Sequence, residues 1–505
     1  MKQGKVWLVG AGPSDVGLLT IKAREVLEQA EVVVYDRLVG PGIMMLIPDT
    51  AECIDVGKRA GNHTMRQEDI NRVLLNKALE GKRVVRLKGG DPFLFGRGGE
   101  ELELLVEHGI SYEIVPGVTS AISVPAYNGI PVTHRDCTSS LHIITGHKKK
   151  DEPLNLDFEA LVRVNGTLVF LMGVAALPDI CGGLLSAGID PKMPAAILQQ
   201  GTTANQKKIV ATVFTLEEEV RKQGIETPAI IVVGKVCAYA SQFEWYEKQP
   251  LFGAKIIVTR PKERISTLSS KLRKLGAQVL EMPAIRTVPI WPNEPLQRAI
   301  EHLAEYQYLV FTSPAGVQYF FDALAEYHLD IRAFGQGKIA VIGQGTEKEL
   351  RKYGLLADLV PEVYDAAHLG IAIGEECKDG DRILIPRACI GSRELTEEIE
   401  KRKQVIISDV PTYDTVHEKQ TLLDEKAEFE EGRISMAVFT SASTVRGFAE
   451  AVRGLDFSKV TAACIGKQTK AAADALGMKT YMAKKATIDD LTDLVVDIHQ
   501  NVNMK

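Results

Sequence analysis

The residues near the N-terminus that are best suited to bind a ligand form a glycine-rich turn, "VWLVGAGPSDVGLLT", from Val6 to Thr20. Gly10 and Gly12 match the first two glycines of the dinucleotide fingerprint G-x-G-x-x-G, but Asp15 stands where the third glycine belongs. Pro13 also lacks the N–H group that a pyrophosphate needs at the start of a helix. The turn therefore disfavours a dinucleotide. It indicates either a ligand without phosphates or a tight strand-to-helix turn that binds nothing.

A second segment, "RLKGGDPFLFGRGGEE" from Arg86 to Glu101, places five glycines around an Asp-Pro-Phe sequence. So many glycines suit a backbone that wraps closely around a ligand and exposes its N–H and C=O groups. The segment lacks the G-K-[ST] ending of a nucleotide-hydrolysing P-loop. A third turn-rich stretch, Val115 to Asp136, ends in His-Arg-Asp, but the other kinase motifs are absent from the sequence. We expect these loops to surround a ligand that is not a nucleotide.

Several charged side chains accompany these loops. Asp36 ends the apolar run "VVVYD", at the strand edge where the ligand crevices of α/β proteins form, and Lys58 lies in "VGKRAG". Without the flanking motifs, a surface ion pair would be the simpler interpretation of both. Guanidinium groups pair with carboxylates in a bidentate manner, which makes three arginines candidates for binding an acidic substrate: Arg59, Arg97 and Arg135.

Composition limits the classes of function. The 505 residues are enough for two to four domains, and the net charge of -6 argues against a nucleic-acid partner. The seven cysteines are far apart and form no CxxC pair, so we expect reduced thiols and no metal site. No apolar run reaches the roughly 18 residues of a membrane-spanning helix. These features predict a cytoplasmic globular protein that does not bind membranes.

Short β-branched runs alternate with amphipathic helical stretches along the chain, which predicts an α/β fold. A domain boundary is expected in the aromatic and polar segment from Ser241 to Lys255. Beyond it the sequence repeats itself: "VFTSPAGVQYFFDAL" from Val310 resembles "VFTSASTVRGFAEAV" from Val438, and "AVIGQGTEKELRKYG" resembles "ACIGKQTKAAADALG". Two copies are too few for a solenoid, so they indicate two similar lobes that face each other across a cleft.

The motifs of the first 245 residues resemble those of uroporphyrinogen-III C-methyltransferase, in the tetrapyrrole methylase family. The matching strings are "VGAGPSD", "VVVYDRLV", "VGKRAGNH", "RLKGGDPFLFGRGGEE", "VPGVTSA", "YNGIPVTHRD", "ITGH", "LVFLMG", "QQGTTANQ" and "PAIIVVG". The resemblance implies a two-lobed methylase fold and S-adenosylmethionine as the methyl donor, released as S-adenosylhomocysteine. This donor has no phosphate. Ser14 departs from the family pattern, in which this position is usually glycine.

The same resemblance implies roles for individual residues. Asp36 would be the proton acceptor and Lys58 the proton donor. The methyl donor would be lined by Pro13, Gly89, Gly90, Asp91, Leu94, Thr119, Ser120, Met172, Gly201 and Ala229.

The duplicated region resembles uroporphyrinogen-III synthase through "VTRP", the paired "VFTS" segments and the paired "IG..T" turns. The resemblance implies two Rossmann-like lobes, one from residues 252–288 and 416–505 and the other from residues 289–415. Tyr413, in "VPTYDTV", matches a recurring tyrosine of the family and would donate a proton to the leaving hydroxyl group. Thr346, Ser441 and Thr469 would bind substrate carboxylates, although residues of these types at such turns are often plain helix caps.

The sequence thus predicts a methyltransferase at residues 1–245 fused to a synthase at residues 246–505. Together they would convert hydroxymethylbilane to uroporphyrinogen III and methylate it twice to precorrin-2. We expect small tetrapyrrole substrates and a homodimer formed through the methyltransferase half. Three alternative functions are a later methylase of the cobalamin pathway, a C-terminal half that senses a ligand or acts as a scaffold, and a dinucleotide oxidoreductase. The last is excluded by Pro13 and Asp15.

Overall fold

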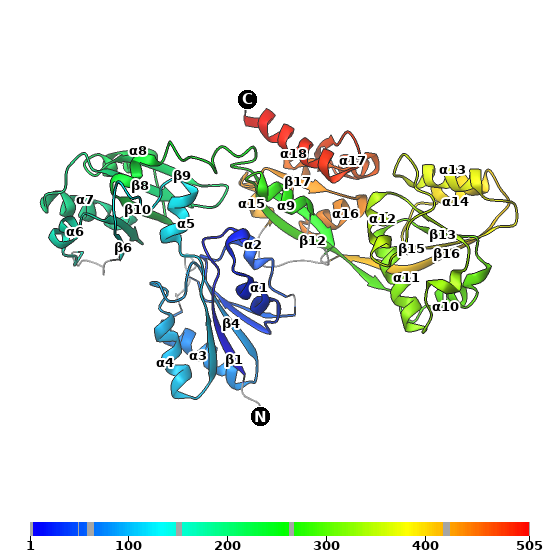
Figure 1. The fold of residues 1–505 in the computed structure, drawn as a ribbon, viewed down its shortest axis with the longest axis horizontal. Helices are drawn as coiled ribbons and strands as arrows, with labels where there is room; N and C mark the ends of the chain where they lie inside the picture. The colour runs from blue at the N-terminus through cyan, green and yellow to red at the C-terminus, as the bar shows by residue number, and fades with distance from the viewer. Residues whose placement is uncertain are drawn as a thin grey trace.

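The computed structural model of the chain describes residues 4–48, 50–57, 65–147, 154–261, 267–417 and 425–503. Three β-sheets organise it (Figure 1). The first two sheets belong to the N-terminal half and the third to the C-terminal half. Lys58 and Arg59 lie outside the described residues.

The first sheet is parallel, with the strand order β3-β2-β4-β1-β5. Its central strands are almost continuous apolar runs because helices and loops cover both faces, as in other parallel sheets. The strands are β1 (Lys5–Gly10), β2 (Val32–Tyr35), β3 (Glu52–Asp55), β4 (Arg83–Lys88) and β5 (Ser111–Val115). The helices are α1 (Ile21–Glu28), α2 (Pro41–Met44), α3 (Gln67–Leu79) and α4 (Gly98–Glu107).

The second sheet is mixed, with the order β6-β7-β10-β8-β9, and β10 runs antiparallel to both of its neighbours. Helix α5 (Ser120–Tyr127) leaves β5 of the first sheet and packs on the second, so it joins the two lobes. The strands are β6 (Leu141–Thr145), β7 (Thr167–Leu171), β8 (Pro194–Gln199), β9 (Lys207–Thr212) and β10 (Ala229–Val233). The remaining helices are α6 (Phe158–Val164), α7 (Leu177–Ser186) and α8 (Leu216–Gln223).

The third sheet has nine strands in the order β14-β13-β15-β16-β12-β11-β17-β18-β19. Two 12-residue strands, β12 (Gln278–Pro289) and β16 (Ile406–His417), run through its middle and pair antiparallel where they meet. Each then continues into a parallel half-sheet of its own. The other strands are β11 (Lys255–Pro261), β13 (Tyr308–Phe311), β14 (Lys338–Val341), β15 (Arg382–Ala388), β17 (Met436–Phe439), β18 (Thr461–Cys464) and β19 (Lys479–Met482).

Helices cover both half-sheets and give each its own apolar core. The half-sheet that contains β13 carries α10 (Glu294–Glu301), α11 (Pro314–Glu326), α12 (Gln344–Arg351), α13 (Ala366–Glu376) and α14 (Glu394–Glu400). The half-sheet that contains β17 carries α9 (Thr267–Lys274), α15 (Glu425–Glu430), α16 (Ala442–Ala451), α17 (Lys467–Asp474) and α18 (Ile488–Asn503). The α/β class and the bilobed form of each half, predicted from the sequence, are confirmed.

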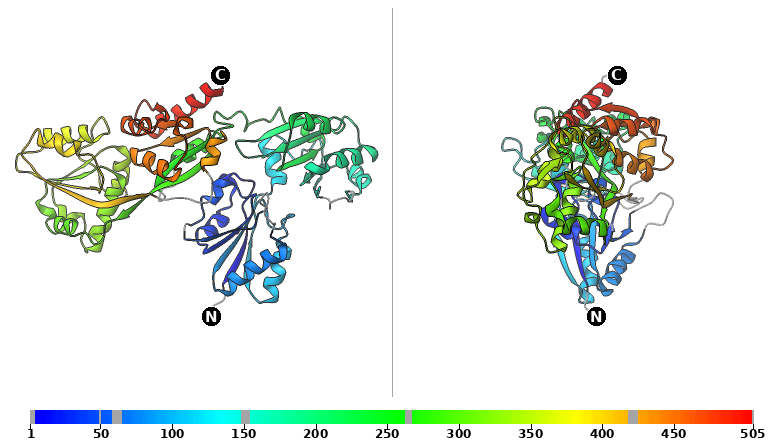
Figure 2. Two further views of the ribbon diagram at one scale, coloured as in Figure 1. Left: turned by 180° about the vertical axis from the view of Figure 1, so that it is seen from behind. Right: turned by 90° about the vertical axis from the view of Figure 1, so that its right-hand side faces the viewer.

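The molecule is elongated (Figures 1 and 2). The lobe of the second sheet and the lobe that contains β13 lie at opposite ends, and the first lobe projects from the middle. The segment expected to contain the domain boundary is packed: the Trp245 indole donates to the carbonyl of Ala126, and Leu251 is buried in the core around β11. The backbone N–H of Ala204 donates to the Gln278 side chain, at 3.0 Å, which links the two halves directly.

No helix of the described ranges is long and apolar enough to cross a membrane. Within the same ranges, no group of three His, Cys, Asp or Glu side chains is arranged to hold a metal ion, and the seven cysteines are unpaired.

Candidate active sites

The glycine-rich loops of the first lobe meet at the carboxyl edge of its sheet. Strand β1 lies between β4 and β5, so the turns that follow the three strands are neighbours. A Cβ on Gly10 would lie 2.5 Å from the Gly117 Cα and 2.6 Å from the Gly90 carbonyl oxygen. Gly12 and Gly90 exchange backbone hydrogen bonds at 3.1 and 2.8 Å. Only glycines permit this approach, so these residues bring the predicted ligand loops together.

Asp91 holds two of these loops with one carboxylate. Its Oδ1 accepts hydrogen bonds from the N–H groups of Phe93 and Leu94, at 2.8 and 3.1 Å. Its Oδ2 accepts from the N–H of Gly117 at 3.0 Å. A carboxylate that accepts three backbone N–H groups is fixed in place. The turn beyond it ends at Thr119, whose hydroxyl caps α5 one residue before Ser120.

Three predicted donor-site residues lie at one edge of the second sheet. Met172 directly follows β7 and Ala229 opens β10, and the antiparallel pairing of these strands brings the end of β7 to the start of β10. Gly201 follows β8, beside Val124 of α5. The hydroxyl of Thr202 donates to the Pro13 carbonyl at 2.6 Å, which ties this edge to the first loop. The first-lobe loops that carry predicted donor-site residues are thus joined by hydrogen bonds, and the Thr202–Pro13 bond joins the edge of the second sheet to them.

Ser14 has φ = 100°, in the region that favours glycine. This is the position at which the sequence departs from the family pattern. The next residue, Asp15, accepts hydrogen bonds from the Gly17 N–H and from the Tyr127 hydroxyl, both at 2.7 Å. Burial and the Asp15 charge raise the pKa of Tyr127 and keep it neutral. The turn is therefore held by its neighbours in a conformation that costs a serine free energy.

Asp36 follows β2 and is one-quarter exposed. Its Oδ1 accepts hydrogen bonds from the N–H groups of Leu38 (3.1 Å) and Gly89 (3.4 Å). Its Oδ2 lies 3.7 Å from Nη2 of Arg86. The predicted proton acceptor is thus positioned by the turn that begins the second glycine-rich loop and by a buried arginine.

The sequence analysis missed the charged residues behind Asp36. Arg86 and Lys88 of β4 are buried, and both donate to Oε1 of the fully buried Glu101 of α4, at 3.1 and 2.8 Å. Burial lowers the pKa of Lys88, and the charge of Arg86 lowers it further. The sequence did contain a signal for this group, because Arg86 and Lys88 interrupt an otherwise apolar central strand. Buried charges need partners of opposite charge.

The arginines predicted to bind substrate are differently placed. Arg97 lies at the start of α4, exposed, and pairs in a bidentate manner with Glu100 at 2.9 and 2.6 Å, which lowers the pKa of that carboxyl. Arg135 is exposed in the turn bridged by His134 and Thr138. Both are accessible to a ligand, and Arg97 would have to share its guanidinium with Glu100.

In the C-terminal half, Tyr413 lies on β16 where this strand passes between the lobes. It is buried, and its hydroxyl lies 2.8 Å from the Ser313 Oγ. Ser313 caps α11, and its Oγ accepts from the N–H of Gly316 at 3.0 Å. Tyr319 packs against the Tyr413 ring at a centroid distance of 5.4 Å. Ser313 is a second functional candidate that the sequence analysis missed, although it lies within the repeated "VFTS" motif.

The remaining predicted residues of this half lie in or at helices that follow parallel strands. Ser441 caps α16, and its Oγ accepts from the N–H of Thr444 at 3.3 Å. Thr346 of α12 and Thr469 of α17 occupy equivalent places in the two repeats and are 2% and 4% exposed. Helix starts therefore cluster at the carboxyl edges of both half-sheets.

Two family models match the chain. Residues 5–217 match the tetrapyrrole (corrin/porphyrin) methylases, and residues 266–493 match the uroporphyrinogen-III synthase HemD. The porphyrin biosynthesis protein HemD of Ruminiclostridium josui is 48% identical over 99% of this chain and 99% of its own length. The chain belongs to both families. The predicted fusion of a methylase with a uroporphyrinogen-III synthase is confirmed, and we call its two parts the methyltransferase half and the synthase half.

Other relatives match the methyltransferase half. The S-adenosyl-L-methionine-dependent uroporphyrinogen III methyltransferase of Methanosarcina barkeri is 52% identical over 46% of this chain and 92% of its own length. A crystal structure of uroporphyrin-III C-methyltransferase from Thermus thermophilus, complexed with S-adenosylhomocysteine, is 39% identical. It covers 46% of this chain and 99% of its own, with a TM-score of 0.41.

Proposed function

We propose that this chain is a bifunctional enzyme of tetrapyrrole biosynthesis. The synthase half cyclises hydroxymethylbilane to uroporphyrinogen III. The methyltransferase half then methylates that product twice to give precorrin-2, at the entry to the sirohaem and cobalamin branches. The observation that carries this proposal is the presence of both family matches on one chain, because the product of one family is the substrate of the other.

S-adenosylmethionine is the methyl donor, and the residues of the first lobe fit it. Gly90 has φ = 69°, and no atom lies within 4 Å of where its Cβ would be, so the backbone there is open to a ligand. Met172 is half exposed at the facing edge of the second sheet. The donor supplies an electrophilic methyl group on a sulfonium sulfur. Its binding residues would be Pro13, Gly89, Gly90, Asp91, Leu94, Thr119, Ser120, Met172, Gly201 and Ala229.

Asp36 accepts the proton that the methylated ring system loses. Its Oδ1 is occupied by two backbone N–H groups, and its partial exposure leaves the carboxylate open to a substrate. Positioning and exclusion of water contribute most to a direct displacement of this kind. Lys58 is proposed as the proton donor from the family pattern.

Tyr413 donates a proton to the hydroxyl group that leaves hydroxymethylbilane. The hydrogen bond to Ser313 orients the phenol, and the serine oxygen is itself fixed by the N–H of Gly316. Arg59, Arg97 and Arg135 would bind carboxylates of uroporphyrinogen III, and Thr346, Ser441 and Thr469 those of hydroxymethylbilane, aided by the positive ends of nearby helices.

Assembly and location complete the proposal. We place the boundary of the halves between Trp245 and Tyr246. Both rings pack against Tyr127 of the methyltransferase half, and Tyr246 also contacts Phe252 of the synthase half. Exposed apolar side chains such as Phe214 support a homodimer through the methyltransferase half, which light scattering of the purified protein would test. The unpaired cysteines support a reducing, cytoplasmic location.

One experiment tests both activities. Purified protein is given hydroxymethylbilane with and without S-adenosylmethionine, and the products are identified by chromatography and mass spectrometry. Uroporphyrinogen III without the donor and precorrin-2 with it are expected. Formation of uroporphyrinogen I alone would refute the synthase activity and leave a sensing or scaffold module as the role of the C-terminal half.

A further inference from the structure

Three buried charged side chains, Arg86, Lys88 and Glu101, lie behind the partly exposed Asp36, and we call these four residues the charge cluster. Glu101 accepts three hydrogen bonds on Oε1, from Arg86, Lys88 and Gln67. Its Oε2 is buried, with no hydrogen-bond partner among the described residues. Two cations therefore share one carboxylate, and Asp36 supplies the second negative charge.

The cluster is balanced only while Asp36 is ionised. Arg86 keeps its proton in proteins, and a buried cation without an anion is strongly destabilised. The guanidinium of Arg86 also donates to the carbonyls of Val34 and Leu87, at 3.3 and 3.1 Å, so it is held in place from both sides. Protonation of Asp36 would leave two buried cations facing one buried anion.

We propose that Arg86, held by Glu101, is a positioning residue that keeps Asp36 ionised and returns it to that state between the two methyl transfers. This inference rests on the proposed function, in which Asp36 accepts a proton from the methylated ring. In that step the C–H bond breaks, its electron pair returns to the ring system and the proton forms an O–H bond with Asp36. The excess positive charge of the cluster then favours release of the proton to water, as the second methylation requires.

Other ionisable groups near Asp36 are few in the described part of the chain. Arg37 follows it, Asp55 ends the adjacent strand β3, Arg86 and Lys88 come from β4 and Glu101 comes from α4. Arg86 is the cation nearest to the Asp36 carboxylate among the described ion pairs.

The test is the pH dependence of methyl transfer with uroporphyrinogen III supplied. Loss of a nearby cation raises the pKa of a carboxyl group, so Arg86→Met should move the acid limb of the profile to higher pH by about one unit. At neutral pH, above the acid limb, kcat and the KM for S-adenosylmethionine should change little. Arg86→Lys keeps the charge and should keep the position of the acid limb. Glu101→Gln should move the limb to lower pH.

Matched controls separate this role from loss of structure. Arg83→Met removes an exposed arginine from the same strand, where it pairs with Glu31, and should leave the profile in place. The synthase activity of the same molecules reports on the other half of the chain. If Arg86→Met does not fold, the isosteric Glu101→Gln and Arg86→Lys decide the matter. An unmoved acid limb in every folded cluster variant would overturn the inference.

The variant Asp36→Asn tests the proposed role of Asp36 separately from the proposed role of Arg86. Full methyltransferase activity in this variant would overturn the proposed role of Asp36. An inactive Asp36→Asn together with unshifted cluster variants would leave that role intact and overturn the positioning role of Arg86 alone.

Discussion

The two halves hold their proposed proton-transfer groups in opposite ways. Asp36 of the methyltransferase half faces Arg86, which is buried with Lys88 and Glu101. Tyr413 of the synthase half bonds to a neutral serine hydroxyl instead. The proposed proton acceptor thus lies against buried ions, whereas the proposed proton donor lies against a neutral hydroxyl.

The loops around the two candidate sites also differ in what holds them in place. The methyltransferase half brings three turns into backbone contact through glycines, whereas the synthase half sets helix starts at the ends of parallel strands. The first arrangement depends on the absence of side chains and the second on the presence of caps. Substitutions therefore act through different physical causes in the two halves.

The largest expected effect concerns the hydrogen-bonded pair Tyr413 and Ser313 of the synthase half. Tyr413→Phe removes the proposed acid and should lower the rate of cyclisation roughly 100-fold, the usual scale of general acid catalysis. Methylation of added uroporphyrinogen III should be unchanged. Tyr306→Phe is the matched control, because this tyrosine is also buried and bonded to a serine, Ser408, at 2.9 Å. Full cyclisation by Tyr413→Phe would remove Tyr413 from the mechanism.

The next effect tests whether the glycine contacts are needed by the methyltransferase half. Gly10→Ala would place a methyl group 2.5 Å from Gly117, and overpacking against backbone costs about 1 to 3 kcal/mol. We expect roughly 10- to 100-fold weaker binding of S-adenosylhomocysteine by calorimetry, with an unchanged synthase rate. Gly182→Ala, in α7 where a Cβ meets no atom within 4 Å, should bind normally. Equal affinity in both variants would contradict the tight approach of the loops.

A smaller effect is expected at Ser14, where a serine occupies a backbone conformation that favours glycine. Ser14 has φ = 100°, so Ser14→Gly should relieve strain of about 1 kcal/mol and stabilise the turn. Hydrogen exchange of the β1 amides should report the gain as slower opening, and donor affinity should not fall. Ser186→Gly, at the end of helix α7, should instead destabilise its lobe. A loss of stability in Ser14→Gly would show that the serine side chain is required.

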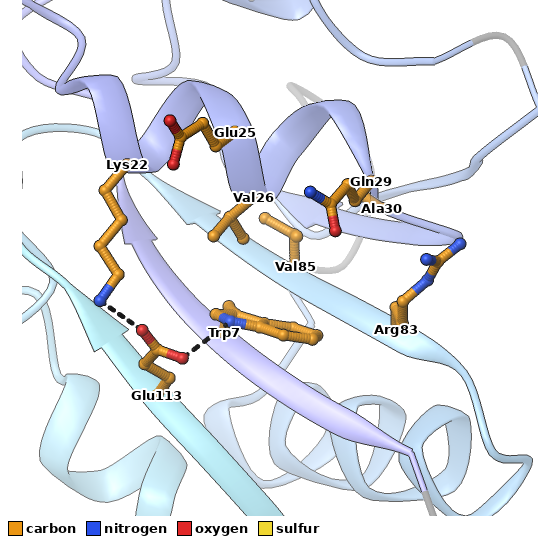
Figure 3. Close-up of a pocket in the computed structure, with 9 residues that line it drawn as sticks. All are labelled: Trp7, Lys22, Glu25, Val26, Gln29, Ala30, Arg83, Val85 and Glu113. Atoms are coloured by element: carbon orange, nitrogen blue, oxygen red, sulfur yellow. Dashed lines mark hydrogen bonds and ion pairs between the residues drawn. The ribbon is translucent and has the colours of Figure 1, made fainter.

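The smallest effect contrasts the buried charges with exposed ones on the same sheet. Glu113 contacts Lys22 and accepts from the Trp7 indole (Figure 3). Its carboxylate also contacts Lys5. The two lysines lower its pKa from 4.5 to about 2. A depressed pKa stabilises the fold above pH 4.5, and this contribution is lost as the pH falls toward 2. Glu113→Gln should therefore cost less than about 1 kcal/mol at pH 7, because the lysines are largely solvated.

The measurement for Glu113→Gln is thermal unfolding of wild type and variant at several pH values. The difference in stability should shrink from pH 4.5 downward. A difference that stays constant with pH would mean that the carboxylate charge contributes nothing and that only packing was changed.

The sequence was sufficient to predict which candidate site residues lie close together where these residues follow strands. Asp36 and Asp91 follow apolar strands, and parallel order brings such ends together, so their neighbourhood was predictable. The partners were not. Glu101 lies one helix beyond Arg86, and Ser313 lies 100 residues before Tyr413, so only the folded chain pairs them. The departure from the family pattern at Ser14 indicates that this position is unusual, but only the structure gives its positive φ.

The two long strands of the synthase half have a mechanical consequence. Between its lobes, β12 and β16 pair with each other over Ile285–Pro289 and Tyr413–His417. At the ends of this stretch, Ile285 also pairs with Pro261 of β11 and Tyr413 with Ala388 of β15. A two-stranded ribbon resists bending in the plane of its hydrogen bonds, whereas its twist varies more than that of a wide sheet. We therefore expect the two lobes to rotate relative to each other most easily about the long axis of this ribbon. Tyr413 lies at the end of the ribbon, where Ser313, Tyr319 and Ala388 attach it to the lobe that contains β13. A rotation about the ribbon would therefore carry Tyr413 with this lobe and change its position relative to the other lobe.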